Sequence, residues 1–332
     1  MNAAVIGSGG WGTALAVQLC KNGHQVRLWS HSGQKVQQMQ LSRENPMLKG
    51  VILPDELCIT ADDTCVKDCN LVVIACPSVH IRLVTQRIAP YIPEGAVMVS
   101  ATKGIEYESF LRMSQIVEEI TGRVTVALTG PSHAEEVARG IPTGLLAACA
   151  DKELAESVQD AFMSDTLRVY TSPDVVGAEL GGALKNVIAM CAGVVEGMGY
   201  GDNTIAMLAT RGLTEIARLG VALGAQKETF AGLAGIGDLI VTCTSRHSRN
   251  RSAGVLIGSG MPVKAAMEKI GAVVEGYYAA RSAMVLAEKC GVEMPIVSAA
   301  YAVLYAQKPV DQVVSQLLLR QRRPESEDAG WL

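Results

Sequence analysis

The chain has 332 residues, 49% of them apolar and 4% aromatic, and its 29 basic residues nearly balance 33 acidic ones. This length allows roughly two domains with sizeable cores, and the charge balance argues against a surface that binds nucleic acid. The chain start lacks a signal-peptide pattern, and no apolar run reaches the ~18–20 residues of a membrane span, so we expect a cytoplasmic protein.

Up to about residue 172, short β-rich runs alternate with helical stretches. The runs are AAVIG, QVRLWS, NLVVIAC, AVMVSATK, VTVALTG, GLLAACA and LRVYTS. Near-continuous apolar strands separated by helices indicate a parallel sheet covered on both faces. The sequence therefore predicts an α/β fold whose first domain, residues 1–173, is a doubly wound sheet of the Rossmann type.

The first predicted turn carries the pattern GSGGWG, between the strand AAVI and a helical stretch that begins TALAVQ. In such a unit Gly7 permits the tight turn, Gly9 lets a pyrophosphate approach the backbone, and Gly12 lets the helix pack on the strand. The helix N-terminus adds unpaired N–H groups and the positive end of its dipole. We expect a dinucleotide site here, although the same glycines also suit a purely structural turn.

The second predicted strand ends in Ser30 and His31, where NAD-selective sites usually place Asp or Glu. A site without that carboxylate does not repel a 2′-phosphate, so we expect NADPH or NADH as the cofactor. His31 is then a candidate cofactor contact, and it equally fits an exposed loop histidine.

The nine cysteines are scattered and contain no CxxC pair. Cys65 and Cys69 lack both a second pair of ligands and nearby histidines, so we expect no metal site. A dispersed set of this kind indicates small core residues in a reducing compartment.

Two later segments follow the ends of predicted strands. SATKG places Lys103 just after one strand, and LTGPSHAEE places Gly130, Ser132 and Ala134 beyond another. Because ligands bind at the carboxyl edge of open α/β sheets, these four residues are candidate binding residues.

After residue 172 the β-rich runs largely stop, and Ala-, Gly- and Leu-rich stretches follow. We expect helices over roughly 174–198, 203–224, 251–259, 262–270, 275–290, 295–306 and 310–320. This pattern predicts an all-helical substrate domain, residues 174–322, and a frayed charged tail, residues 323–332. Helical domains of this sort often pair, so we expect a homodimer.

The predicted helix GAELGGALKNVIAMCAG contains Gly181 and Gly182, and each costs about 1 kcal/mol relative to alanine. That cost indicates close approach by another backbone, a cofactor or a substrate. Lys185 follows within one turn in almost wholly apolar surroundings. Whereas most lysines are solvated, a lysine in such surroundings can have its pKa shifted and can exchange a proton with a substrate.

The segment GIGDL places Asp238 in a glycine-rich turn, and TCTSRHSRNRSAG follows it. Arginines, together with Ser248 and Asn250 ahead of a predicted helix, form a natural receptor for a compact phosphate. Taken alone, the same residues also fit a solvated basic loop.

Nine motifs occur in order across both halves: VIGSGGWGTALA, ATKG, GPSHAEE, LGGALKNVIA, RGLTEIARLG, AGIGDL, TCTSRHSRNR, VVEGY and EMPI. With them the chain resembles, nearly end to end, the bacterial NAD(P)-dependent sn-glycerol-3-phosphate dehydrogenases. The resemblance implies a soluble cytoplasmic enzyme that reduces dihydroxyacetone phosphate to sn-glycerol 3-phosphate for phospholipid synthesis. Gly10, Ser132 and His133 stand at positions where members of this family vary.

The resemblance also implies a role for each matching residue. Cofactor contacts fall on Gly10, Trp11, His31, Lys103, Ala134, Arg249, Val273 and Glu275. Substrate contacts fall on Lys103, Gly130, Ser132, Lys185, Asp238, Ser248, Arg249 and Asn250. Lys185 matches the lysine that transfers the proton, while Asp238 is expected to orient it and Lys103 to add a second cation.

Two other functional classes share parts of this pattern. A two-domain reductase acting on a β-hydroxyacid or ketopantoate would have the first domain and a lysine-bearing helix, but would not need SRHSRNR. A non-catalytic NAD(P)-binding redox sensor would need the glycine loop, but not Lys103, Lys185 and Asp238.

Overall fold

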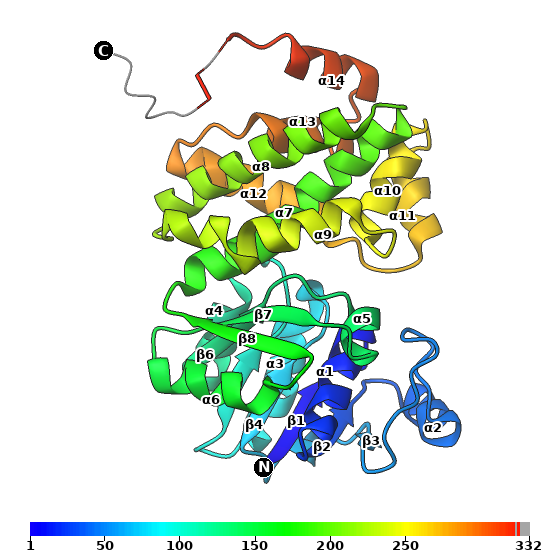
Figure 1. Cartoon of the computed structure of the whole chain (residues 1–332), viewed down its shortest axis with the longest axis vertical. Helices are drawn as coiled ribbons and strands as arrows, with labels where there is room; N and C mark the ends of the chain where they lie inside the picture. The colour runs from blue at the N-terminus through cyan, green and yellow to red at the C-terminus, as the bar shows by residue number, and fades with distance from the viewer. Residues whose placement is uncertain (323, 326–332) are drawn as a thin grey trace.

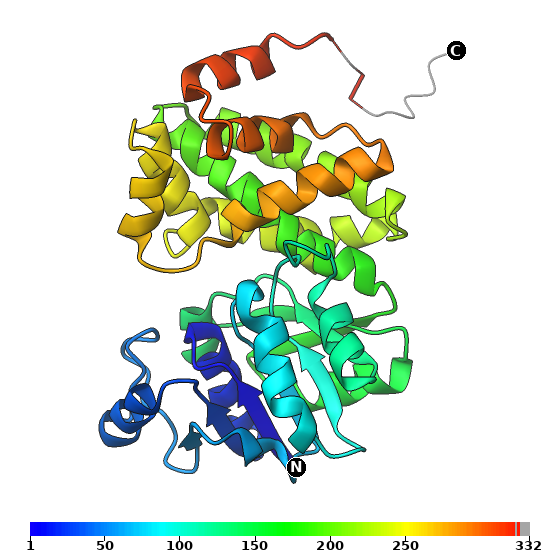
Figure 2. The ribbon, with the colours of Figure 1, turned by 180° about the vertical axis from the view of Figure 1, so that it is seen from behind.

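The computed structural model describes residues 1–322, 324 and 325. Figure 1 shows the sheet below and a helical region above, joined where α7 begins. From behind, Figure 2 shows that helices cover the sheet on this side too. The expected fold class, a Rossmann-type sheet followed by a helical region, is confirmed. Most of the expected frayed tail, residues 323 and 326–332, lies outside the described residues.

Eight strands form one sheet in the order β3-β2-β1-β4-β5-β6-β7-β8. The strands are β1 (Asn2–Ile6), β2 (Gln25–Trp29), β3 (Cys58–Thr60), β4 (Leu71–Ile74), β5 (Val97–Ser100), β6 (Thr125–Thr129), β7 (Thr143–Ala148) and β8 (Leu167–Ser172). Neighbouring strands are parallel, except that β7 runs antiparallel to β6. The chain order reverses between β1 and β4, which makes their carboxyl ends the switch point of the sheet.

The antiparallel β7 corrects the expectation of a wholly parallel sheet. The connection from β6 to β7 holds only α5 (Ala134–Ala138), a helix of five residues. At about 8 Å long it is too short to carry the chain back to the opposite edge, so β7 starts at the edge where β6 ends. The other helices on the sheet are α1 (Gly10–Lys21), α2 (Gly33–Ser42), α3 (Ile81–Ile88), α4 (Met113–Thr121) and α6 (Lys152–Phe162).

The glycine loop between β1 and α1 has the geometry that its spacing predicts. Gly7 has φ +128°, and a Cβ there would lie 2.5 Å from the carbonyl oxygen of Ala75. A Cβ on Gly12 would lie 1.9 Å from the carbonyl oxygen of Gly7, whereas one on Gly9 would meet nothing within 4 Å. Gly7 and Gly12 are therefore required by packing, and the face beside Gly9 is open.

Helix α7 (Val175–Gly197) runs through the centre of the helical region (Figure 1). It is the one helix of the described chain long and apolar enough to cross a membrane, yet 83% of its most apolar window is buried. Its apolar sequence is thus accounted for by packing. Around it lie α8 (Asp202–Ala222), α9 (Asp238–Thr244), α10 (Arg249–Gly258), α11 (Val263–Ile270), α12 (Glu275–Cys290), α13 (Pro295–Leu304) and α14 (Val310–Leu318).

Residues 233–244 differ from the expected glycine-rich turn. A π-helical turn, Leu233–Gly237, leads directly into α9, whose first residue is Asp238. Glycine lowers helix propensity, but a Cβ on Gly235 would lie 2.0 Å from the carbonyl oxygen of Phe230. Tertiary packing therefore requires the glycine inside a helical segment.

Helices α7 and α10 approach closely through four glycines, Gly193 and Gly197 on α7 and Gly254 and Gly258 on α10. A Cβ on Gly254 would lie 2.0 Å from the carbonyl oxygen of Met190. A Cβ on Gly193 would lie equally close to the carbonyl oxygen of Arg251. This contact fixes the start of α10 beside the middle of α7.

We expect Gly254→Val to lower the free energy of unfolding by about 2–3 kcal/mol, because the added side chain must push two helices apart. Thermal or urea unfolding measures the effect. Gly33→Ala is the matched control, since a Cβ there meets nothing within 4 Å and Gly33 has no positive φ. An unchanged midpoint for Gly254→Val would show that the two helices separate without cost.

Candidate active site

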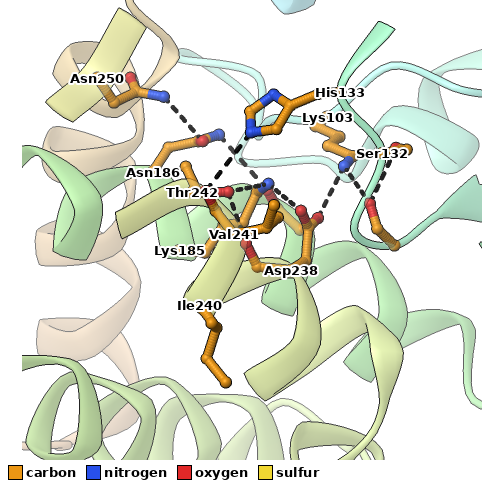
Figure 3. Close-up of polar contacts among 12 residues, drawn as sticks. Lys103, Ser132, His133, Lys185, Asn186, Asp238, Ile240, Val241, Thr242 and Asn250 are labelled. Atoms are coloured by element: carbon orange, nitrogen blue, oxygen red, sulfur yellow. Dashed lines mark hydrogen bonds and ion pairs between the residues drawn. The ribbon is translucent and has the colours of Figure 1, made fainter. Parts of the chain in front are cut away.

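Two lysines share one carboxylate where the two parts of the chain meet (Figure 3). Lys185 Nζ on α7 donates to Asp238 Oδ1, and Lys103 Nζ, in the loop after β5, donates to Asp238 Oδ2 at 2.7 Å. Lys103 Nζ also donates to the carbonyl oxygen of Gly130, after β6, at 2.9 Å. The structure thus brings together four residues that lie in separate motifs of the sequence.

The three charged side chains of the cluster differ in their exposure to solvent. The side chains of Lys185 and Asp238 are 7% and 1% exposed, and that of Lys103 is 19% exposed. Burial lowers the pKa of Lys185 to about 7, although the Asp238 carboxylate opposes the shift. An amine with such a pKa can both donate and accept a proton at neutral pH.

The pH dependence of turnover should follow this lowered pKa. Reduction of a ketone needs Lys185 as an ammonium, so kcat for reduction should fall as the pH rises through about 7. Oxidation of the alcohol needs the neutral amine and should rise over the same range. Rates in both directions between about pH 6 and pH 9 measure this, and parallel profiles would exclude Lys185 as the titrating group.

The glycines of α7 make room for protein atoms. A Cβ on Gly181 would lie 2.4 Å from the carbonyl oxygen of Ala234, in the turn that leads to Asp238. A Cβ on Gly182 would lie 2.7 Å from Thr129 Oγ1 and 3.8 Å from Lys103 methylenes. Among the three causes that the sequence left open, close approach by another backbone applies to Gly181. Gly181 lets the helical turn before Asp238 approach α7, and Gly182 leaves room for Thr129 and the Lys103 side chain.

Thr242 belongs to the cluster and was not anticipated from the sequence. Its hydroxyl accepts from Lys185 Nζ at 2.7 Å and donates to the carbonyl oxygen of Asp238 at 2.6 Å. Thr242 lies one helical turn after Asp238 on α9, and the i, i+4 spacing would have identified it had residues 238–244 been predicted as a helix.

The loop after β6 lines the cluster on the sheet side. Gly130 has φ +124°, and its carbonyl oxygen accepts from Ser132 Oγ at 3.0 Å as well as from Lys103. The next residue, His133, lies with Nε2 3.4 Å from the carbonyl oxygen of Val241 on α9. From the sequence, His133 was noted only as a position where the family varies, and no role in the site was expected for it.

The residues expected to form a phosphate receptor lie at the start of α10. Ser248 is the N-cap, and its hydroxyl accepts from the backbone N–H of Arg251 at 3.2 Å. Asn250 is buried, donating to Asn186 Oδ1 and accepting from the N–H of Gly276, both at 2.9 Å. Arg251 pairs with Glu196 at 2.5 Å. Arg249 is exposed and makes no hydrogen bond or ion pair with the residues described here, so its guanidinium can meet an anion.

The glycine loop fits a dinucleotide pyrophosphate. Gly9 caps α1 without a side-chain hydrogen bond, and the space beside it is open. A Cβ on Gly10 would lie 3.0 Å from the carbonyl oxygen of Met47 and 3.6 Å from the Cβ of Ala134. Trp11 Nε1 is buried and has no hydrogen-bond partner in the described chain. The open space beside Gly9 at the start of α1 thus suits a pyrophosphate, and Gly10, Trp11 and Ala134 lie next to it.

Ser30 and His31, which follow β2, differ in their exposure to solvent. Ser30 is 1% exposed, and its N–H donates to the carbonyl oxygen of Thr60 at 2.9 Å. His31 is exposed, and residues 30–36 contain no carboxylate. The cofactor preference is therefore best tested at His31, since an aspartate at Ser30 would be a buried charge.

His31→Asp is expected to weaken NADPH binding by tenfold or more relative to NADH, because the new carboxylate faces the 2′-phosphate at short range. Fluorescence titration with each cofactor measures both dissociation constants. His31→Asn, which adds no charge, should affect the two cofactors alike. Equal losses in His31→Asp would place the adenosine ribose elsewhere.

The segment before α12 carries two of the expected cofactor contacts, Val273 and Glu275, and only Glu275 is shown in contact with the sheet domain. Val273 lines a cleft of about 1010 Å³ among α10, α11, α12 and the α13–α14 connection. Glu275, the first residue of α12, accepts from the N–H of Ser78 at 3.2 Å and from its hydroxyl at 2.5 Å. Burial raises the pKa of the Glu275 carboxyl.

Comparison with known proteins places this geometry in a family. Residues 2–155 match the N-terminal model and residues 174–315 the C-terminal model of NAD-dependent glycerol-3-phosphate dehydrogenase. The chain belongs to this family. Glycerol-3-phosphate dehydrogenase [NAD(P)+] of Moorella thermoacetica is 50% identical over 99% of this chain and 98% of its own length. That of Agathobacter rectalis is 47% identical over 98% of each chain.

Solved structures of glycerol-3-phosphate dehydrogenases have the same fold. The Coxiella burnetii enzyme superposes with a TM-score of 0.92 at 35% identity, covering 96% of this chain and 99% of its own. A ketopantoate reductase from Ralstonia eutropha superposes with a TM-score of 0.61 at 15% identity, covering 96% of this chain and all of its own. The second likeness shows the fold alone.

Proposed function

We propose that the chain reduces dihydroxyacetone phosphate reversibly to sn-glycerol 3-phosphate, with NADPH or NADH, and so supplies the glycerol backbone of phospholipids. The observation that carries this proposal is the Lys103–Asp238–Lys185 cluster, in which a buried lysine and a partly accessible one share a carboxylate where the two parts of the chain meet. Family membership supports the same reaction.

The cofactor supplies the hydride for the carbonyl carbon of the substrate. Lys185, as an ammonium, hydrogen-bonds the carbonyl oxygen and gives its proton to the alkoxide formed there. Asp238 and Thr242 hold its Nζ in place, and Lys103 adds a second positive charge beside the developing anion.

Arg249 is the side chain best placed to hold the substrate phosphate, because it begins α10 and has no partner in the described chain. Ser248 and Asn250 are committed to bonds that build the helix start. We therefore assign Ser248 and Asn250 to the substrate site as residues that position Arg249. We assign Gly130 and Ser132 to the side of the substrate site formed by the sheet domain. Fixing the phosphate also fixes the ketone, which can supply several kcal/mol of the barrier.

NADPH absorbance tests the proposal when dihydroxyacetone phosphate is compared with unphosphorylated dihydroxyacetone. We expect rapid oxidation with the phosphate ester and very slow oxidation with the free ketone. Turnover of ketopantoate in preference to dihydroxyacetone phosphate would contradict the proposal. Cofactor binding without turnover of either ketone would instead indicate a redox sensor.

Three further proposals concern organisation. We place the domain boundary at residues 173 and 174, between β8 and α7, which is where strands give way to helices. We also propose a cytoplasmic location, where a small phosphorylated substrate would be available. We propose a homodimer because helical domains of this sort often pair. Light scattering would measure the oligomeric state.

A further inference from the structure

Two serines of the sheet domain bind glutamates of the helical domain in the same bidentate way. Ser114 on α4 donates its N–H to Glu179 Oε1 at 2.8 Å and its hydroxyl to Oε2 at 2.6 Å. Ser78 donates its N–H to Glu275 Oε1 at 3.2 Å and its hydroxyl to Oε2 at 2.5 Å. Arg112 also pairs with Glu179, which makes that bridge a structural anchor.

The bridge at Ser78 lies at the sheet's switch point. Ser78 follows β4, and the intervening residues Ala75 and Cys76 lie against Gly7 of the glycine loop. Dinucleotides bind in the crevice between the two strands where the chain order reverses, here β1 and β4. Glu275 therefore reaches from the helical domain onto the crevice that the cofactor would occupy.

Glu275 is also tied to the catalytic cluster. A Cβ on Gly104, the neighbour of Lys103, would lie 2.5 Å from Ser78 Cβ and 3.6 Å from Glu275 Oε2. On its other side, the N–H of Gly276 donates to Asn250, which donates to Asn186 beside Lys185. The first turn of α12 thus connects the crevice to both lysines of the cluster.

We propose that Ser78 is a positioning residue for the dinucleotide: through Glu275 it holds the first turn of α12 over the crevice, so that the nicotinamide end is kept against the Lys103–Asp238–Lys185 cluster. The proposal rests on the proposed function for the presence of a dinucleotide. Its tests are binding measurements that need no turnover.

Protonation of Glu275 should weaken this bridge. A protonated carboxyl loses one of the two acceptors that Ser78 uses, so NADH affinity should fall as the pH falls through the raised pKa of Glu275. The charges of Arg249 on α10 and of His80, two residues after Ser78, also act on this carboxyl and oppose the rise of its pKa. The pH profile is therefore measured in a His80→Gln variant, which removes the nearby imidazole. NADH is used because it lacks the 2′-phosphate of NADPH, which would itself titrate.

The central experiment is fluorescence titration of the full chain with NADH. Ser78→Ala should weaken binding about tenfold and flatten the acidic limb of the pH profile, because it removes a bond to a charged group. Ser78→Thr keeps the hydroxyl and should restore most of the affinity. In a Glu275→Ala background, Ser78→Ala should have almost no further effect.

Ser114→Ala is the matched control, because it breaks the same kind of bridge away from the crevice. It should lower the melting temperature and leave NADH affinity within about twofold. Unchanged affinity in Ser78→Ala, or equal losses in Ser78→Ala and Ser114→Ala, would overturn the positioning role. Failure of the unmodified chain to bind NADH or NADPH would instead overturn the proposed function.

Discussion

Lys185→Met is expected to lower kcat by at least a hundredfold while leaving the fold and cofactor binding largely intact. Lys185 Nζ is held by Asp238 and Thr242 inside an apolar helix, where burial lowers its pKa to about 7. Loss of a positioned proton donor typically costs 10²–10⁴ in rate. Methionine nearly matches the length of the lysine side chain, so the packing around α7 should change little.

The same substitution leaves Asp238 paired with Lys103 alone, which keeps its carboxylate compensated. Cofactor affinity and melting temperature should therefore stay close to their original values and serve as internal checks. Lys269→Met, at an exposed position of α11, is the matched control and should keep full activity. If Lys185→Met retained more than a tenth of the original kcat, Lys185 would not be the acid.

The parts of the fold predicted from sequence are those encoded by local pattern. Gly7, Gly9 and Gly12 occupy the geometry that their spacing implies, because one turn between a strand and a helix satisfies all three constraints. Apart from α9, the α-helices after residue 174 were predicted with boundaries within a few residues, since apolar periodicity and glycine or proline breaks are local as well.

The parts that sequence could not supply depend on contacts between distant segments. Strand β7 is antiparallel because the connection before it is too short to cross the sheet. The helix that begins at Asp238 depends on the packing of Gly235 against Phe230. In the site, the clustering of Lys103 with Asp238 could be expected from the family resemblance. The Ser78–Glu275 bridge could not, because 197 residues separate its two members.

Arg249→Ala should reduce kcat/KM for dihydroxyacetone phosphate by ten- to a few hundredfold. Arg249 is exposed at the first position of α10 and makes no hydrogen bond or ion pair with the described residues, so its guanidinium can bind a ligand anion, although its charge also acts on the Glu275 carboxyl. A charge-assisted contact of this type contributes about 1.5–3 kcal/mol. Arg249→Lys should recover only part of the loss, because one ammonium cannot reproduce the planar fork of the guanidinium.

Arg246→Ala is the matched control, since Arg246 is exposed in the same basic segment but lies before the helix begins. Steady-state kinetics on both ketones separate the roles open to Arg249. Against unphosphorylated dihydroxyacetone, which we expect to be a very poor substrate, Arg249→Ala should matter far less, because this ketone has no phosphate for Arg249 to bind. Equal losses on both ketones would mean that Arg249 serves the cofactor or the fold, since its charge also acts on the Glu275 carboxyl. A selective loss on the phosphate ester would assign the start of α10 to the substrate phosphate.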